Sequence, residues 1–129
     1  MKDETDIWLE YAAENLASAR ILLDSGLFNS CLQNVQQCVE KSLKAVLVEL
    51  YANLVKTHSI SKLKQMLTEK GTNISITDDE CDLLDTIYLP SKYPIGSVIP
   101  EYAPDADICR DCIAIACRVN ESVKDILGK

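Results

Sequence analysis

Apolar residues recur at steps of three and four along most of this chain, which is the spacing of one face of an α-helix. The clearest run lies between residues 28 and 54. It predicts one continuous buried stripe made of Phe28, Leu32, Val35, Val39, Leu43, Val46, Leu50 and Leu54. A similar stripe predicts a first helix over residues 3–25, with Gly26 just past its end. No segment alternates apolar and polar residues for long enough to predict a strand.

A short helix and a medium-length helix are predicted next. Thr57 or Ser59 caps the short helix, and Gly71 ends it. Residues 77–80 have the form of a capping box, which predicts the medium-length helix over residues 78–88. The residues expected to face inward are Ile60, Leu63, Met66 and Leu67 in the former and Cys81, Leu84 and Ile87 in the latter.

All four prolines fall in residues 89–104, where a long loop is expected. The last helix begins at Pro104 or Asp105 and ends at Gly128, with an apolar stripe of Ile108, Cys112, Ile115, Val119, Val123 and Ile126. The chain is therefore predicted to be all-α and to form a single domain over residues 1–129. Its expected architecture is an antiparallel up-and-down bundle of four main helices plus a short fifth helix.

The net charge of -7 argues against general binding to a nucleic-acid backbone. Residues 39–72 are nevertheless weakly basic, because they hold six lysines against three glutamates. No stretch approaches the roughly 20 apolar residues that a membrane span requires. The first six residues are too acidic for a signal peptide, so a cytoplasmic location is expected.

The six cysteines are expected to be free thiols that pack in the core, since a reducing compartment is expected. Cys109 and Cys112 have the C-x-x-C spacing of metal and redox sites. A zinc site would need two further ligands, for which Cys81 and Cys117 are the candidates. Cys117, however, lies about 140° around the helix from Cys112. No metal site is expected.

Polar residues of the helix predicted over residues 28–54 gather on one side of it. At about 100° per residue, Gln37, Glu40, Lys41 and Lys44 fall at about 140–240° from Val35, so they are expected to face away from the core. One interpretation is a solvated face with a Glu40–Lys44 ion pair. The other is a contact surface, in which Gln36, Gln37, Lys41 and Lys44 bind a partner subunit, a nucleotide phosphate or another anion.

The ordered series of motifs resembles the HEPN domain family (higher eukaryotes and prokaryotes nucleotide-binding). The series begins with Trp8, Ala12 and Leu16 and continues with residues 26–28 and 36–45. It ends with residues 57–60, Leu63 and residues 92–94, where Lys92 stands in place of the family's usual arginine before tyrosine and proline.

This resemblance implies an antiparallel helical bundle that is commonly dimeric and often paired with a minimal nucleotidyltransferase. Members bind nucleotides or cleave RNA in toxin–antitoxin and defence systems. In the ribonuclease branch, four to six residues separate an arginine from the histidine that follows it. Here the only histidine is His58, and the positions that would need arginine hold Tyr51, Ala52 and Asn53. No catalytic residue is therefore assigned, and His58 remains the sole candidate.

The favoured hypothesis is a non-catalytic HEPN-like binding module without a cofactor or metal. It would form a homodimer and bind a nucleotide, a nucleotidyltransferase partner protein, or both. Its expected contact residues are Gln36, Gln37, Glu40, Lys41, Lys44, His58, Lys92 and Tyr93. One alternative is an RNA-cleaving toxin with a degenerate motif, in which Lys56 or Tyr93 assists His58. Another is a purely structural subunit of a larger assembly, and His58 then only packs and bonds locally beside a helix cap.

Overall fold

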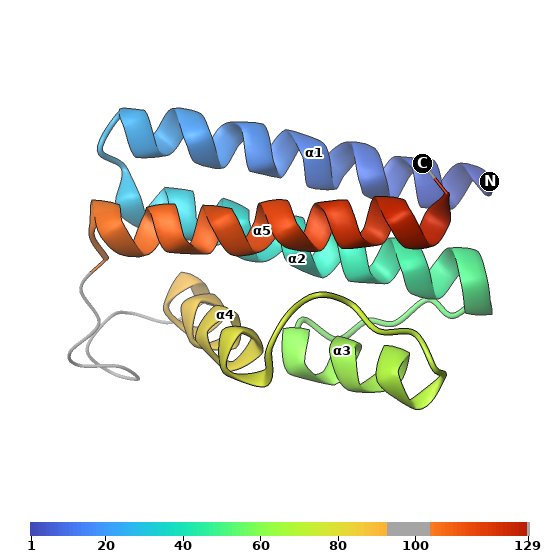
Figure 1. The fold of residues 1–129 in the computed structure, drawn as a ribbon. Coiled ribbons are helices and arrows are strands. Elements are labelled where there is room, and N and C mark those ends of the chain that lie inside the picture. Colours follow the sequence, from blue (N-terminus) through green and yellow to red (C-terminus); the bar gives the residue numbers. More distant parts are fainter. Residues whose placement is uncertain (93–103, 129) are drawn as a thin grey trace.

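The computed structural model describes residues 1–92 and 104–128, except for the side chains of residues 89–92. Within these residues the chain forms five helices: α1 (Asp3–Asp24), α2 (Phe28–Tyr51), α3 (Ile60–Glu69), α4 (Asp78–Lys92) and α5 (Ala106–Leu127). Figure 1 shows α1, α2 and α5 side by side as the three long helices, with the shorter α3 and α4 on one side of them. The predicted all-α bundle is confirmed.

Helix α2 is the centre of the bundle, because it packs against each of the other four helices. Fourteen of its 24 residues are buried, and they lie on every side of the helix. The prediction that Glu40 and Lys44 face outward is therefore wrong, since these residues are only 3% and 5% exposed. Helical periodicity locates the face opposite Val35, but it does not reveal that α1 and the chain around His58 cover that face.

The turn between α1 and α2 is set by Gly26, whose φ of 72° lies in the left-handed region that glycine adopts without strain. The amide of Leu27 donates to the Leu22 carbonyl, and the amide of Gly26 donates to the Leu23 carbonyl. These two bonds form a Schellman motif, which satisfies the last carbonyls of α1. The chain then reverses, and α2 runs back along α1.

Residues 52–59 return along the bundle in an extended path (Figure 1). Helix α2 ends at Tyr51 rather than near Leu54, because Ala52 adopts a left-handed conformation with φ of 49°. The carbonyl of His58 accepts a hydrogen bond from Gln36, in the first half of α2, whereas the Tyr51 hydroxyl reaches the carbonyl of Lys70, just beyond α3. The returning segment thus places His58 beside the middle of α2.

The predicted caps of the other helices are confirmed. Ser59 caps α3, residues 77–80 form a reciprocal capping box at α4, and Asp105 caps α5. Helix α4 extends to Lys92, so residues 89–92, predicted to be loop, are helical. Tyr93 and Pro94 lie outside the described residues.

The core contains most of the predicted apolar positions of all five helices. Leu50 and Leu54 are exceptions, because they are 44% and 58% exposed near the end of α2. Met66 is half-buried rather than buried. All six cysteines are free, and five of them are buried. None of the described helices is long and apolar enough to span a membrane.

Candidate ligand-binding site

A ladder of three polar side chains lies along one side of α2. Gln36, Glu40 and Lys44 are spaced four residues apart, so they stack along the helix axis. The Gln36 amide donates to Glu40 Oε1 at 3.2 Å, and Lys44 Nζ donates to Glu40 Oε2 at 2.9 Å. All three are at least 95% buried. The predicted Glu40–Lys44 pair exists, but in the interior of the protein.

His58 covers the carboxylate of Glu40. Its Nδ1 lies 3.3 Å and 3.2 Å from the two carboxylate oxygens, and its carbonyl accepts a hydrogen bond from Gln36. The Glu40 side chain is 4% exposed and the His58 side chain is 52% exposed. The histidine therefore connects a buried anion to the protein surface.

Two aromatic rings adjoin this network. The His58 ring stacks on Tyr88 of α4, with ring centroids 5.0 Å apart and planes 15° apart. On the other side, Lys44 Nζ lies 5.6 Å from the centre of the Trp8 ring of α1, a cation–π distance. Helices α1 and α4 thus hold the two ends of a network that is built on α2.

A hollow of about 530 Å³ opens beside His58. Its lining combines the two stacked rings with three hydroxyl groups and one carboxylate, from Thr57, His58, Ser59, Asp85, Thr86 and Tyr88. A volume of several hundred Å³ is in the range of small-molecule sites. The stacked rings offer an aromatic edge. The hydroxyls of Ser59 and Thr86 donate to Asp85 and to the Asp82 carbonyl and so offer acceptors, while the Thr57 hydroxyl offers a donor.

Asp85 fixes the segment that carries His58. Its carboxylate accepts from the amides of Ile60 and Ser61, at 2.6 Å and 3.2 Å, and from the hydroxyl of Ser59 at 3.1 Å. These groups form the first turn of α3, whose amide hydrogens have no partner within the helix. Asp85 therefore caps α3 from α4, directly after His58.

The arrangement defines the chemistry that is open to His58. A carboxylate within hydrogen-bond distance of Nδ1 favours the tautomer that carries the proton on Nδ1, which leaves Nε2 as an acceptor. Such an oriented imidazole can accept a ligand proton or a hydrogen bond. Lys44 balances the charge of Glu40, so the buried pair does not leave an isolated ion in the interior.

The remaining predicted residues are only partly gathered here. Gln37 joins the ladder, because its amide donates to Gln36 Oε1 at 2.8 Å. Lys41 turns to α1 instead, where it donates to Asn15 and lies 5.7 Å from the centre of the Tyr11 ring. Lys92 is the last residue of α4, its side chain is not described, and Tyr93 lies outside the described residues.

The arginines of the chain are bound to other partners. Arg20 donates to Cys117, Arg110 to Asp107, and Arg118 to Ser75 and Glu80. Tyr51, at one of the positions where the ribonuclease motif would need arginine, contacts Thr72 and the Lys70 carbonyl. The described contacts of His58 thus involve no arginine.

The thiols are poorly suited to nucleophilic chemistry, because burial raises the pKa of both Cys31 and Cys112 to about 12. Burial also raises the pKa of Cys38 and Cys81 to about 11. Among the described residues, no group of three or more histidine, cysteine, aspartate or glutamate side chains is arranged to hold a metal ion.

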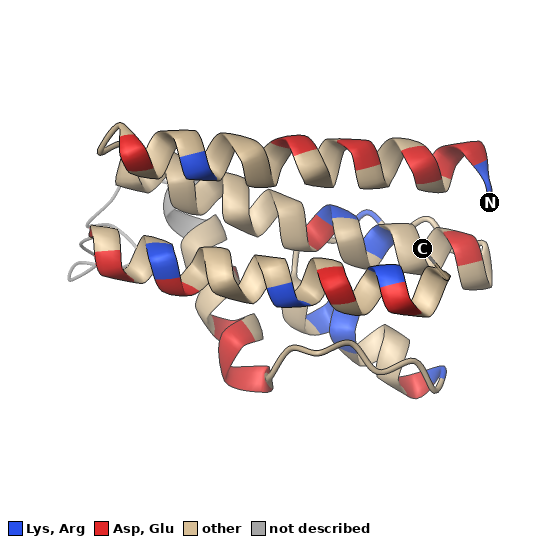
Figure 2. Ribbon diagram, turned by 45° about the horizontal axis from the view of Figure 1, so that its top comes forward, with Lys and Arg blue, Asp and Glu red and all other residues tan. Residues whose placement is uncertain are grey.

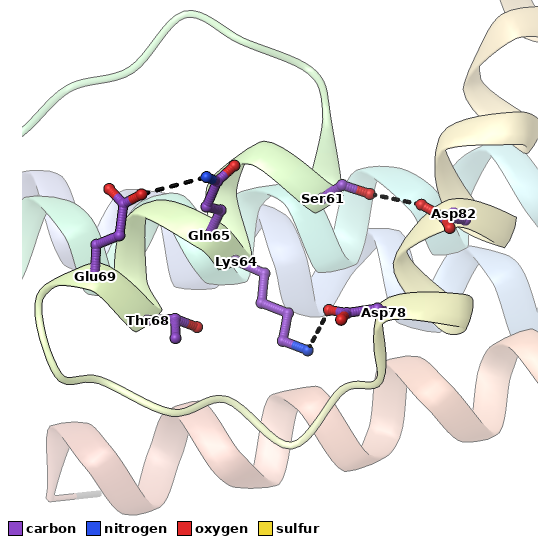
Figure 3. A pocket seen from close by; sticks show the side chains of 7 residues that line it. All are labelled: Ser61, Lys64, Gln65, Thr68, Glu69, Asp78 and Asp82. Carbon is purple, nitrogen blue, oxygen red and sulfur yellow. Dashed lines mark hydrogen bonds and ion pairs between the residues drawn. The ribbon is translucent and has the colours of Figure 1, made fainter.

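A second hollow, of about 450 Å³, lies between α3 and α4 (Figure 3). Six of its seven lining side chains form three pairs with one another. Lys64 pairs with Asp78 at 2.8 Å, Ser61 donates to Asp82, and Gln65 donates to Glu69. Because these groups satisfy each other, a ligand there would have to displace existing bonds.

The sequence pattern did not predict the roles of Asp85 and Tyr88 or the contact of Trp8 with Lys44. Asp85 and Tyr88 each lie next to a member of the predicted apolar stripe of α4, Leu84 and Ile87. That position could have indicated that both face a neighbouring helix. Their pairing with α3 and His58 depends on the return of residues 52–59, for which the sequence holds no local signal.

Comparison with known proteins identifies the family of the chain. The model of the HEPN domain matches residues 5–126, so the chain belongs to the HEPN domain family. The toxin candidate MJ1304 of Methanocaldococcus jannaschii is 26% identical over 137 residues, which cover 94% of this chain and 86% of that protein.

Two solved structures share the fold. TT1696 from Thermus thermophilus has a TM-score of 0.74 and 22% identity, with 96% of this chain and 98% of that chain covered. ST0689, described as an archaeal HEPN homologue, has a TM-score of 0.69 and 25% identity, with 97% and 98% covered.

Proposed function

We propose that this HEPN domain is a non-catalytic binding module of a two-component, toxin–antitoxin-like system, and that it binds a nucleotide in the hollow beside His58. The observation that carries this proposal is the combination of an oriented, half-exposed imidazole with a stacked tyrosine at the edge of a hollow of about 530 Å³. The similarity to a toxin candidate supports the two-component setting.

The lining favours the base of the nucleotide over its phosphates. Aromatic rings stack on nucleobases with about 1–3 kcal/mol per base, and His58 and Tyr88 offer such a surface. The hydroxyls of Ser59 and Thr86 already donate to Asp85 and to the Asp82 carbonyl, so they can accept from the polar edge of a base, whereas the Thr57 hydroxyl can donate to it. The described side chains that line the hollow include no lysine or arginine for a phosphate group.

Calorimetry with ATP, GTP, CTP and UTP tests the proposal. Saturable heat is expected for at least one of them, and Tyr88→Leu should weaken that binding by about tenfold, since it keeps an apolar side chain but removes the stacking ring. Tyr11→Leu is the matched control, because Tyr11 is exposed on α1, away from the hollow, and should bind like the unaltered chain. The absence of heat at millimolar nucleotide would reject the binding module.

The proposal extends to assembly: a homodimer, and pairing with a minimal nucleotidyltransferase partner. Sedimentation velocity tests the first, and co-purification with a nucleotidyltransferase encoded beside this chain tests the second. A monomer at all concentrations, together with separate elution of the partner, would restrict the proposal to nucleotide binding alone.

An RNA-cleaving toxin is the second candidate, favoured by the Glu40–His58 pair, which resembles the carboxylate-oriented histidines of acid–base sites. Expression that inhibits growth, and that becomes harmless in His58→Ala, would support it. Intact RNA after incubation with the purified protein would exclude it.

A further inference from the structure

Helix α1 carries a face that no other described part of the chain covers. Ile7 and Tyr11 are 48% and 52% exposed, and Glu4 and Glu14 are exposed as well. At about 100° per residue, these four side chains fall within about 80° of one another, turned away from the buried residue Ala12. We call Glu4, Ile7, Tyr11 and Glu14 the α1 stripe.

Two hollows lie along the α1 stripe. A hollow of about 210 Å³ is lined by Glu4, Ile7, Trp8 and Tyr11. A second hollow, of about 350 Å³, follows it and is lined by Tyr11, Glu14, Asn15, Ser18, Asn34 and Lys41. Single exposed apolar residues are ordinary, but aromatic and apolar side chains that line a common hollow are typical anchor points of interfaces.

The side chains beneath the α1 stripe are held in place. Lys41 donates to Asn15 at 2.8 Å and lies 5.7 Å from the centre of the Tyr11 ring. Lys44, fixed by Glu40, lies 5.6 Å from the centre of the Trp8 ring. The rings are therefore positioned before any partner arrives, which reduces the entropy lost on binding.

The charge of α1 is uncompensated. Residues 1–24 hold six acidic residues against Lys2 and Arg20, and Figure 2 shows acidic positions along the length of the helix. Lys2 and Arg20 are engaged elsewhere, with the Val48 carbonyl and the Cys117 thiol. The helix dipole favours acids in the first turn, but Glu14 lies well beyond it. Neither Glu4 nor Glu14 has an ion pair with another described residue.

We propose that the α1 stripe docks a basic amphipathic helix of a partner protein. From Glu4 to Glu14 the stripe extends about 15 Å, which equals about ten residues of a helix laid along it. Apolar residues of the partner, one turn apart, contact Ile7 and Tyr11, and one of them enters the apolar first hollow. A polar residue enters the second hollow, whose lining is polar apart from Tyr11, and lysines or arginines meet Glu4 and Glu14. A second copy of this chain fits this face less well, because each copy carries a net charge of -7.

Trp8 makes the test direct, because it is the only tryptophan of the chain and it lines the first hollow. The probe is a synthetic 15-residue helical peptide with leucines one turn apart and flanking lysines, without aromatic residues. It should change the emission of Trp8 in a saturable way that weakens as salt is raised. A peptide of the same pattern, with glutamates in place of the lysines, should leave the emission unchanged.

Variants at exposed positions locate the contact without endangering the fold. Ile7→Ser should weaken the binding of the lysine peptide by about tenfold. Ile21→Ser should bind the peptide normally, because Ile21 is 67% exposed on the same helix but lies outside the α1 stripe. The double variant Glu4→Gln/Glu14→Gln should lower both affinity and salt dependence, and Glu121→Gln on α5 should change neither.

Three results would overturn the proposal. The first is an unchanged Trp8 emission at millimolar lysine peptide, and the second is equal binding of the two peptides. The third is a dimer in sedimentation velocity that Ile7→Ser dissociates, which would identify a second copy of this chain as the occupant of the face.

Discussion

At the scale of single residues, Glu40 is the centre of the buried polar network. Its buried carboxylate receives Gln36, Lys44 and His58, which come from two segments of the chain. A carboxylate in the interior is tolerated because Lys44 balances its charge and hydrogen bonds replace its water. Removal of one charge of such a pair leaves the other uncompensated.

Glu40→Ala should lower the free energy of unfolding by about 3–5 kcal/mol, because the ammonium group of Lys44 would stay buried without its partner. Urea denaturation measures the change. Glu10→Ala, an exposed acid on α1, is the control and should stay within about 0.5 kcal/mol of the unaltered chain.

The double variant Glu40→Leu/Lys44→Met should recover most of that loss, since a buried ion pair can be replaced by apolar residues of similar volume at little cost. If Glu40→Ala and Glu10→Ala have equal effects, the carboxylate is not buried in the way described.

At the scale of elements, α4 connects the short helix α3 to the candidate site. Asp85 caps α3 from a neighbouring helix, and Tyr88, about one turn later, supports the His58 ring. A single helix thus sets both the position of the histidine segment and one wall of the hollow.

Asp85→Ala should cost about 1–2 kcal/mol, the upper range for the loss of a helix cap, because several donors at the start of α3 lose their acceptor. Thermal or urea unfolding measures it. Asp79 is exposed in the first turn of α4, and Asp79→Ala should lower the free energy of unfolding by only a few tenths of the Asp85→Ala cost. An equal cost of the two substitutions would contradict the capping role of Asp85.

Glu80 gives α4 a pH dependence. Burial alone would raise the pKa of Glu80, but hydrogen bonds from Arg118 and from the Thr77 amide outweigh it and hold this pKa below the ordinary value of 4.5. A depressed pKa in the folded state contributes stability that is fully present above pH 4.5 and is lost as the pH falls below it.

Glu80→Gln should therefore destabilise the chain by up to about 1 kcal/mol at pH 7 and by progressively less towards pH 3. Urea midpoints at several pH values test this. A difference between the variant and the unaltered chain that stays constant with pH would contradict the role of the charge.

Many of the helix ends were predictable from the sequence. The predictions that failed share one cause. Gly26, Ser59, the capping box at residues 77–80 and Asp105 are local signals, and each predicted a helix end that the structure confirms. The burial of Glu40 and Lys44 was not predictable, because it depends on what packs against α2 from elsewhere in the chain. Asp85 and Tyr88 were missed for the same reason.

At the scale of the whole molecule, α2 is surrounded by the other four helices. Five of the six cysteines are buried in the interior of the protein. Burial raises the pKa of Cys31 and Cys112 to about 12, and that of Cys38 and Cys81 to about 11, from an ordinary value of 9.0. Unfolded chains can ionise these thiols at a pH where the folded chain cannot. The free energy of unfolding therefore depends on pH in the alkaline range.

Stability should be unaffected by these thiols below about pH 9 and should fall above it, by about 1 kcal/mol per buried thiol at pH 10. Urea midpoints between pH 7 and pH 10 measure the fall. In the same range, native alkylation should modify Cys117, the one half-buried thiol, before the other five. Rapid alkylation of all six in the folded protein would contradict the buried arrangement.

The imidazole signals of His58 report most directly on whether this residue stands at the edge of a nucleotide site. His58 is the only histidine of the chain, so its ring protons are assigned in an NMR spectrum without any variant. Titration with ATP, GTP, CTP and UTP should shift these signals for at least one nucleotide, in a saturable manner, because a base stacked beside the ring changes its magnetic environment. Ring signals that stay unchanged at millimolar concentrations of all four nucleotides would contradict nucleotide binding beside His58.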